Sequence, residues 1–130
     1  MRAFKLLKKG SKLYSIVNHK CPRCHEGDFF THKLNFNPKK VIKQNETCSH
    51  CNLKYAIEPS FFFGAMYVSY AINVAIIVTT FIICKVFLDV TIIQSFIAII
   101  ITAAILIPLT LRLSRIIWIN IFVNYEKKLK

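Results

Sequence analysis

Charge is almost absent from one long stretch of this chain. The protein has 130 residues, with 18 Lys or Arg against 6 Asp or Glu. Between Pro59 and Leu111, however, only Lys85 and Asp89 carry a charge. A buried soluble hairpin is disfavoured here, because no other part of the chain is large enough to cover so much apolar surface. The sequence therefore predicts a membrane protein in which this stretch is embedded in lipid.

The sequence also shows neither the pattern of a secretory signal peptide nor a recognisable set of catalytic groups. Residues 1–17 are basic and only intermittently apolar, so they lack the continuous apolar run of a secretory signal peptide. The first long apolar segment is then expected to stay in the mature protein as an anchor. The chain also offers no nucleophile–base pair and no open metal position, so we do not expect an enzyme.

The apolar stretch is long enough for two membrane spans. As helices, residues 59–84 would extend roughly 39 Å and residues 90–111 roughly 33 Å, each more than the ~30 Å hydrocarbon core of a bilayer. One helix over both would be far too long, so the chain is expected to turn back around Lys85–Asp89. This turn contains no Gly, Pro or Asn, so its prediction depends on length alone. Pro108 is expected to kink the second span.

The basic residues predict the orientation of this all-α transmembrane hairpin. Every Lys and Arg except Lys85 lies outside residues 59–111, and positive loops stay on the cytoplasmic side. Both termini are therefore expected in the cytoplasm, with residues 1–18 as a basic interfacial segment and residues 112–130 as a basic tail. The cations expected to meet lipid headgroups are Lys5, Lys8, Lys9, Lys12, Arg112 and Arg115.

Two Cys-x-x-Cys pairs precede the hairpin, with 23 residues between them. Four thiolates at this spacing suit tetrahedral zinc, and a reducing compartment favours metal over disulfide. The predicted ligands are Cys21, Cys24, Cys48 and Cys51. Residues 19–58 are thus expected to fold as a small β zinc ribbon around one zinc ion. Because four protein ligands leave no open position, this zinc should be structural.

The residues around the cysteines fit this interpretation. His25 and Asn52 follow the two pairs, where the chain often needs a left-handed backbone, and both residue types tolerate it. A fragment of about 40 residues cannot bury enough apolar surface to fold alone. Metal binding can supply on the order of 10–16 kcal/mol, which is enough to fold it.

Other interpretations of the basic, cysteine-rich half remain open. A single iron ion in a rubredoxin-like site would use similar cysteine pairs and would make the protein a redox or electron-transfer carrier. A thiol redox pair agrees less well with two Cys-x-x-Cys copies at ribbon spacing. Residues 1–58 hold twelve Lys or Arg against four acids, a balance that favours anionic partners. Nucleic acid is not the expected one, because interleaved aromatics and a recognition helix are missing.

Small and polar residues share a face of the first span. Ala65, Ser69 and Asn73 recur every four residues, which favours close helix packing over a transport path, since no charge lies in mid-span. The segment from Glu58 to Tyr70 is unusual for a plain anchor, although Glu58 could simply cap the helix start. We expect contacts with a partner or a neighbouring helix from Glu58, Gly64, Tyr67, Ser69, Tyr70 and Asn73.

Four motifs together suggest a family. They are Gly10-Ser-Lys-Leu-Tyr-Ser-Ile16, Cys21-Pro-Arg-Cys-His-Glu-Gly-Asp28, Cys48-Ser-His-Cys51 and Glu58-Pro-Ser-Phe-Phe-Phe-Gly-Ala-Met-Tyr-Val-Ser-Tyr70. In these motifs the chain resembles a bacterial membrane family, the domain-of-unknown-function family numbered 983, and in particular its Bacteroidetes-type members. The resemblance covers nearly the whole sequence and implies a zinc-ribbon-like motif followed by a helical hairpin in the inner membrane.

The resemblance implies no established activity. In some bacteria, members of this family are encoded beside assembly factors for haem-copper oxidases, which implies an accessory role. We therefore expect a non-enzymatic inner-membrane zinc-ribbon protein that acts as an accessory, assembly or scaffold factor for a membrane complex. Its expected partners are the lipid bilayer and a membrane protein or a second copy of the chain. The alternative is a rubredoxin-like iron protein that transfers electrons.

Overall fold

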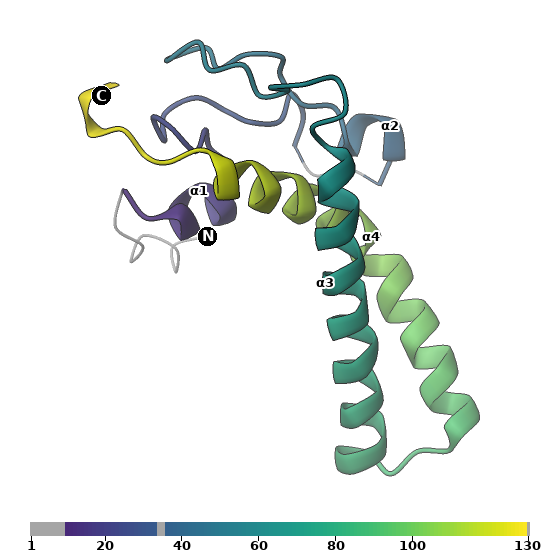
Figure 1. The fold of residues 1–130 in the computed structure, drawn as a ribbon. Helices are drawn as coiled ribbons and strands as arrows, with labels where there is room; N and C mark the ends of the chain where they lie inside the picture. Colours follow the sequence, from purple (N-terminus) through teal and green to yellow (C-terminus); the bar gives the residue numbers. More distant parts are fainter. Residues whose placement is uncertain (1–9, 34–35, 130) are drawn as a thin grey trace.

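The computed structural model describes residues 10–33 and 36–129. Its helical elements are α1 (Lys12–Asn18), α2 (Pro38–Val41), α3 (Phe63–Ile82), the π-helical turn η2 (Ile83–Phe87), α4 (Ile92–Phe122) and the 3₁₀ turn η3 (Lys127–Leu129). Figure 1 shows a hairpin, formed by α3 and the first part of α4, that projects from a head. The head consists of the described residues up to Phe62, and the second part of α4 runs beneath it.

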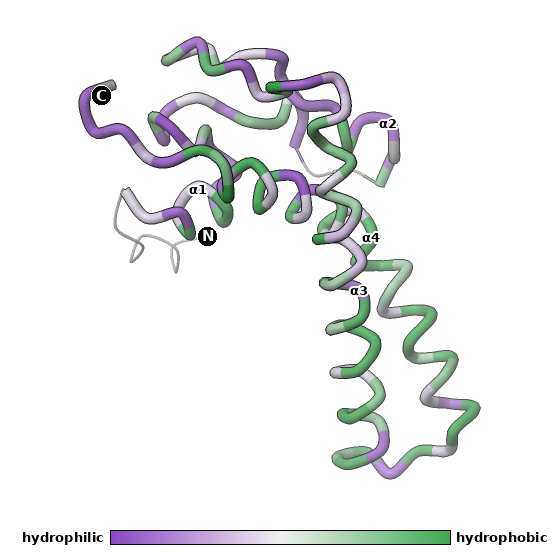
Figure 2. Tube along the Cα trace, in the orientation of Figure 1, coloured by the Kyte–Doolittle hydropathy of each residue, from purple (hydrophilic) through white to green (hydrophobic). Residues whose placement is uncertain are grey.

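Two helices are long and apolar enough to cross a membrane. They span Phe63–Phe87 and Ile92–Phe122, and the most apolar 18-residue window of each has a mean hydropathy of 2.0 and 2.5, respectively. Only 6% and 11% of these 18-residue windows are buried within the protein, whereas the core helix of a soluble protein would be mostly buried. Figure 2 shows hydrophobic residues along most of the hairpin and more hydrophilic ones in the head. The predicted pair of apolar helices is therefore confirmed.

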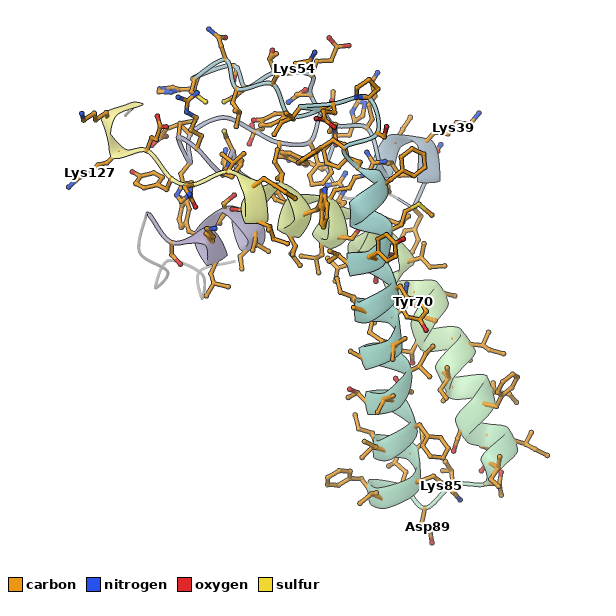
Figure 3. The ribbon with its side chains drawn as sticks, viewed as in Figure 1. Lys39, Lys54, Tyr70, Lys85, Asp89 and Lys127 are labelled. Atoms are coloured by element: carbon orange, nitrogen blue, oxygen red, sulfur yellow. The ribbon has the colours of Figure 1, made fainter. Side chains whose placement is uncertain are left out.

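The turn between the two helices is built from local hydrogen bonds. Asp89 adopts a left-handed backbone with a φ of 45°, and the Lys85 ammonium donates to the carbonyl of Val90 at 3.0 Å. Thr91 and Gln94 form a reciprocal capping box that starts α4. Figure 3 shows Lys85 and Asp89 at the tip of the hairpin. The Thr-x-x-Gln pattern is a sequence signal for this helix start, and it does not depend on Gly, Pro or Asn.

Helix α4 bends away from α3 beneath the head (Figure 1). It contains Pro108, which lacks the N–H that would bond to the carbonyl four residues earlier, and this loss is a common cause of helix kinks. The Thr110 hydroxyl donates to the carbonyl of Leu106 at 2.9 Å, a contact that also bends helices. The helix then continues to Phe122, well past Leu111, where the sequence places the end of the second span.

The expected β ribbon is not confirmed. Within the described part of residues 19–58, the only β pairings are three isolated bridges, and none extends into a strand. They join Lys20 to Asp28, Phe30 to Gln44 and Thr47 to Lys54. What the structure does show is a cluster of four cysteines followed by two long apolar helices.

The head and the second part of α4 share one hydrophobic core. Its buried members are Cys21, Cys24, Phe29, Phe30, Cys48, Tyr55, Ile116 and Ile119. Two hydrogen bonds reinforce this contact: the Trp118 indole donates to the carbonyl of Phe61 at 2.7 Å, and the Asn120 amide donates to the Ser15 hydroxyl at 3.2 Å. The head therefore uses α4 as one wall of its core, which compensates for its small size.

Candidate metal centre

The four predicted cysteines lie together in the head, where three of them are buried. Their sulfur atoms are all within 4.8 Å of one another. The Cys24 and Cys48 sulfurs are 3.6 Å apart, and those of Cys21 and Cys51 are 3.7 Å apart. A tetrahedral zinc ion with Zn–S bonds of about 2.3 Å separates its sulfur ligands by roughly 3.8 Å. The donor set and its spacing therefore fit one tetrahedral metal ion, and four thiolates also suit a single iron ion.

The backbone turns that present these sulfurs are those predicted from the sequence. After the first pair, the N–H of His25 donates to the carbonyl of Cys21 at 3.0 Å, and the φ of His25 is 59°. After the second pair, the N–H of Asn52 donates to the carbonyl of Cys48 at 3.1 Å, and the φ of Asn52 is 55°. The prediction of a left-handed residue after each pair is confirmed. Each turn places two sulfurs on the same side of the chain.

The protein stabilises these thiolates unequally. Burial raises the pKa of Cys51, and the charge on Cys21 raises it further. Burial alone would also raise the pKa of Cys48, but hydrogen bonds from the backbone N–H groups of Cys51 and His50 outweigh it and bring this pKa to about 6. Four thiolates at this spacing repel one another. A divalent cation at their centre would turn that repulsion into attraction and keep all four deprotonated.

The end of the chain clamps the first cysteine pair. The Arg23 guanidinium donates to the Glu126 carboxylate at 3.0 and 3.2 Å, and the Glu126 N–H donates to the carbonyl of Arg23 at 3.0 Å. The His25 ring lies between two tyrosine rings, with centroid distances of 5.3 Å to Tyr14 and 4.4 Å to Tyr125. No sequence pattern predicts this clamp, because Arg23 and Glu126 lie 103 residues apart in the chain.

The cations expected to meet lipid occupy different environments. Lys12 is exposed on α1, while Lys5, Lys8 and Lys9 lie outside the described residues. Arg112 is only 3% exposed, and its Nη2 donates to the carbonyls of His32 and Lys33 at 2.6 and 2.8 Å. The Nη1 of Arg115 donates to the carbonyl of Ile42 at 3.1 Å and to the Gln44 side chain at 3.3 Å. Both arginines thus hold loops of the head onto α4.

The residues expected to contact a partner divide into two groups. Ser69, Tyr70 and Asn73 line one cavity with Arg115. Glu58 and Gly64 border another hollow, together with Trp118. Tyr67 lies in neither group and is 79% exposed. Helix α3 begins at Phe63 without a side-chain cap, so the Glu58 carboxylate makes no capping hydrogen bond there.

A family model described as "Protein of unknown function (DUF983)" matches residues 36–122. The matched span contains the second cysteine pair and both long helices, and the first cysteine pair precedes it. No curated protein and no solved structure matches the chain.

Proposed function

Because the chain belongs to the DUF983 family, whose function is unknown, we propose its function from the arrangement of its cysteine cluster and its helices. It is a non-enzymatic membrane protein whose zinc-stabilised head offers a binding surface to a membrane complex, as an accessory, assembly or scaffold factor. The head lies at the cytoplasmic face of a bacterial inner membrane. The observation that carries this proposal is the packing of the four-cysteine cluster against α4, the helix that continues into the apolar hairpin.

Zinc at the cysteine cluster is the first part of the proposal. The sulfur spacing supports a tetrahedral ion held by all four thiolates, which leaves no position for a substrate. Two of the three β-bridges, Lys20–Asp28 and Thr47–Lys54, pair residues on either side of a cysteine pair, as a zinc ribbon would, and metal binding would stabilise these short pairings. The zinc would then fix the shape of the head, and the head would act through its surface.

Membrane insertion is the second part of the proposal. In both long helices only a small share of the most apolar window is buried within the chain, and lipid is the medium in which such apolar exposure is stable. The polar head lies at one end of the hairpin, where it would remain in water (Figure 2). The head would thus be held at a fixed distance from the bilayer, which suits a protein that positions other membrane components.

Metal analysis of the purified protein tests the first part. We expect a colourless sample with about one zinc per chain, because four thiolates form one tetrahedral site. Replacing Cys21, Cys24, Cys48 and Cys51 together by Ser should remove the metal. Cys84→Ser is the matched control, since Cys84 lies in η2 at the far end of the hairpin and should leave metal content unchanged. A red protein that contains iron would contradict zinc and favour the electron-transfer alternative.

Crosslinking in intact membranes tests the role of the head. We expect the wild-type chain to be crosslinked to a membrane protein or to a second copy of itself, and the fourfold Cys→Ser variant to lose that product while remaining in the membrane. The Cys84→Ser variant should retain it. If the metal-free variant keeps the same crosslinks, the folded head is not the binding surface.

A further inference from the structure

A cavity of about 430 Å³ opens beside α3 and the second part of α4, below the head. We call it the interhelical wedge. Its polar lining residues are Ser69, Tyr70, Asn73, Ser114 and Arg115. The rest of its lining is apolar and includes Phe62 and Met66. Figure 3 shows Tyr70 on α3 near the level at which α4 bends. The volume is within the range of about 300–1,000 Å³ that is typical of ligand pockets.

The polar groups of the interhelical wedge are incompletely paired. The Ser114 hydroxyl donates to the carbonyl of Leu111 at 3.0 Å. In the Arg115 guanidinium, which lies over the Phe62 ring, only Nη1 has hydrogen-bond partners within the described residues, so Nε and Nη2 still carry donors. The side chains of Ser69 and Asn73 likewise have no hydrogen-bond partner in the described part of the chain. Polar groups on membrane helices are costly unless something satisfies them, and they often mark a binding site.

The charge of the interhelical wedge favours an anion. No Asp or Glu lines it, and Arg115 supplies a permanent positive charge. Ile42, which also lines the cavity, directly follows α2, where Lys39 and Lys40 are exposed. Figure 1 shows α2 beside the start of α3, close to the same level of the molecule. These lysines would add to the positive potential at the mouth of the cavity.

The position of the interhelical wedge favours a lipid over a soluble anion. It lies at the junction of the polar head and the apolar hairpin, which is the depth of lipid phosphates if the hairpin spans the bilayer (Figure 2). A soluble phosphate would leave the apolar walls uncovered, and a hydrocarbon chain alone would leave Arg115 without an anion. A phospholipid would cover the apolar walls with its acyl chains and supply an anion to Arg115 with its phosphate. Basic pockets between membrane helices on the cytoplasmic side are known to bind phospholipid headgroups.

We propose that the interhelical wedge binds one phospholipid, with its phosphate at Arg115 and its glycerol ester groups at Ser69 and Asn73. The proposal rests on the membrane insertion proposed above. The bound lipid would fill the space between α3 and the second part of α4 and so hold the head at its angle to the hairpin. The occupant differs from bulk lipid in that a specific guanidinium and two helix side chains recognise it.

Native mass spectrometry of the full-length protein in detergent tests this site. The probes are phosphatidylglycerol and a diacylglycerol with the same acyl chains, which lacks the phosphate. We expect one bound phosphatidylglycerol per chain and little diacylglycerol. Arg115→Gln should weaken phosphatidylglycerol binding by on the order of tenfold, because it removes charge-assisted hydrogen bonds to the phosphate. Lys54→Gln, which removes an equal charge from an exposed site at the top of the head (Figure 3), outside the cavity lining, should bind as the wild type does.

A second pair of variants separates loss of the lipid site from misfolding of the head. It is needed because Arg115 also donates hydrogen bonds to the carbonyl of Ile42 and to the Gln44 side chain. Asn73→Leu fills the interhelical wedge without touching the head and should also reduce phosphatidylglycerol binding. Thr79→Leu, at an exposed site on the same helix, should not. The proposal is overturned if diacylglycerol binds as tightly, if inorganic phosphate displaces the lipid, or if a lipid-free dimer is the species observed.

The two proposals fail in different ways. If the chain is released from membranes by alkaline carbonate, membrane insertion is wrong and the lipid site falls with it. If the chain resists extraction but its phosphatidylglycerol binding does not depend on Arg115 and Asn73, only the lipid site is wrong. Zinc content measured on the same samples shows whether the head has remained folded in each variant.

Discussion

Gly27 lies so close to the cysteine cluster that no side chain fits there. A β-carbon at this position would overlap the sulfur of Cys48. The N–H of Cys21 also donates to the carbonyl of Gly27 at 2.8 Å, so the backbone cannot easily move away. The turn that follows the first cysteine pair is one reason for a glycine at this position. The structure shows a second reason, which is the close approach of the backbone to a metal ligand.

We predict that Gly27→Ala weakens metal binding. The added methyl group would push the Cys48 sulfur out of tetrahedral geometry, or displace a hydrogen-bonded turn, at a cost of about 1–3 kcal/mol. That cost corresponds to a metal affinity lower by roughly tenfold to a hundredfold. Competition with a chromogenic zinc chelator would measure the loss. Ser49→Ala, which removes an exposed hydroxyl beside the same ligand, is the control. Equal affinities for Gly27→Ala and the wild type would contradict the prediction.

The sequence predicts the conformation of a residue well when that conformation is determined by its neighbours in the chain. The left-handed backbones of His25 and Asn52 follow from the geometry of a cysteine pair, so the sequence predicts both. The clamp of Arg23 by Glu126 follows from the path of the whole chain, so no sequence pattern indicates it. The same holds for Gly27, whose neighbour Cys48 is far away in the sequence.

Gly64 and Trp118 form a close contact between α3 and α4. A β-carbon on Gly64 would overlap the indole ring of Trp118, whose Nε1 is hydrogen-bonded to Phe61 at 2.7 Å. The ring therefore packs directly on the backbone of α3, as small residues allow in membrane helices. Trp118 also packs on Phe122, with a centroid distance of 5.0 Å. This contact determines how the second part of α4 crosses α3.

We predict that Gly64→Ala destabilises this crossing although alanine is the better helix former. Helix propensity alone would favour the variant by up to about 1 kcal/mol, whereas overpacking against Trp118 costs about 1–3 kcal/mol. Thermal unfolding in detergent should therefore show a lower Tm. The double variant Gly64→Ala/Trp118→Leu provides the control, because the added methyl group should cost little once the indole is gone. A higher Tm for Gly64→Ala would contradict the observed packing.

Length and hydropathy predict the two long helices, but they do not predict where α4 ends. The two apolar helices follow directly from the scarcity of charge between Pro59 and Leu111. The extension of α4 to Phe122 does not, because charged residues such as Arg112 are typical of a tail outside the membrane. In the structure the backbone carbonyls of the head pair with Arg112, so the charge lies beneath the head without ending the helix.

At the scale of the whole molecule, the head and the hairpin form one connected structure. Their shared core joins Cys21 and Cys48 to Ile116 and Ile119 on α4. The sequence predicts the two parts and their order, because each has its own composition. It could not predict that one helix serves both, since that depends on a bend that brings the second part of α4 under the head (Figure 1). Metal binding and the angle of the helices are therefore expected to be coupled.

If the hairpin spans a membrane as proposed, the shape also implies which ends of the molecule share a side of it. Figure 1 shows the head and both ends of the described chain at one end of the hairpin. Lys85 and Asp89 lie at the opposite end (Figure 3). All other Lys and Arg residues lie outside residues 59–111, and an excess of positive charge is retained in the cytoplasm. The head should therefore face the cytoplasm, where reduced thiols are available for zinc.

We predict that reporters will show this orientation directly. A fluorescent protein fused after Lys130 should fold and fluoresce, and alkaline phosphatase at that position should be inactive, because it needs the oxidising periplasm to form its disulfides. Alkaline phosphatase inserted between Leu88 and Asp89, at the tip of the hairpin, should be active. A chain cut after Leu88 and fused to the same enzyme is the control for effects of insertion on α4. Phosphatase activity after Lys130 would place the cysteine cluster in an oxidising compartment and contradict both the orientation and the proposed zinc site.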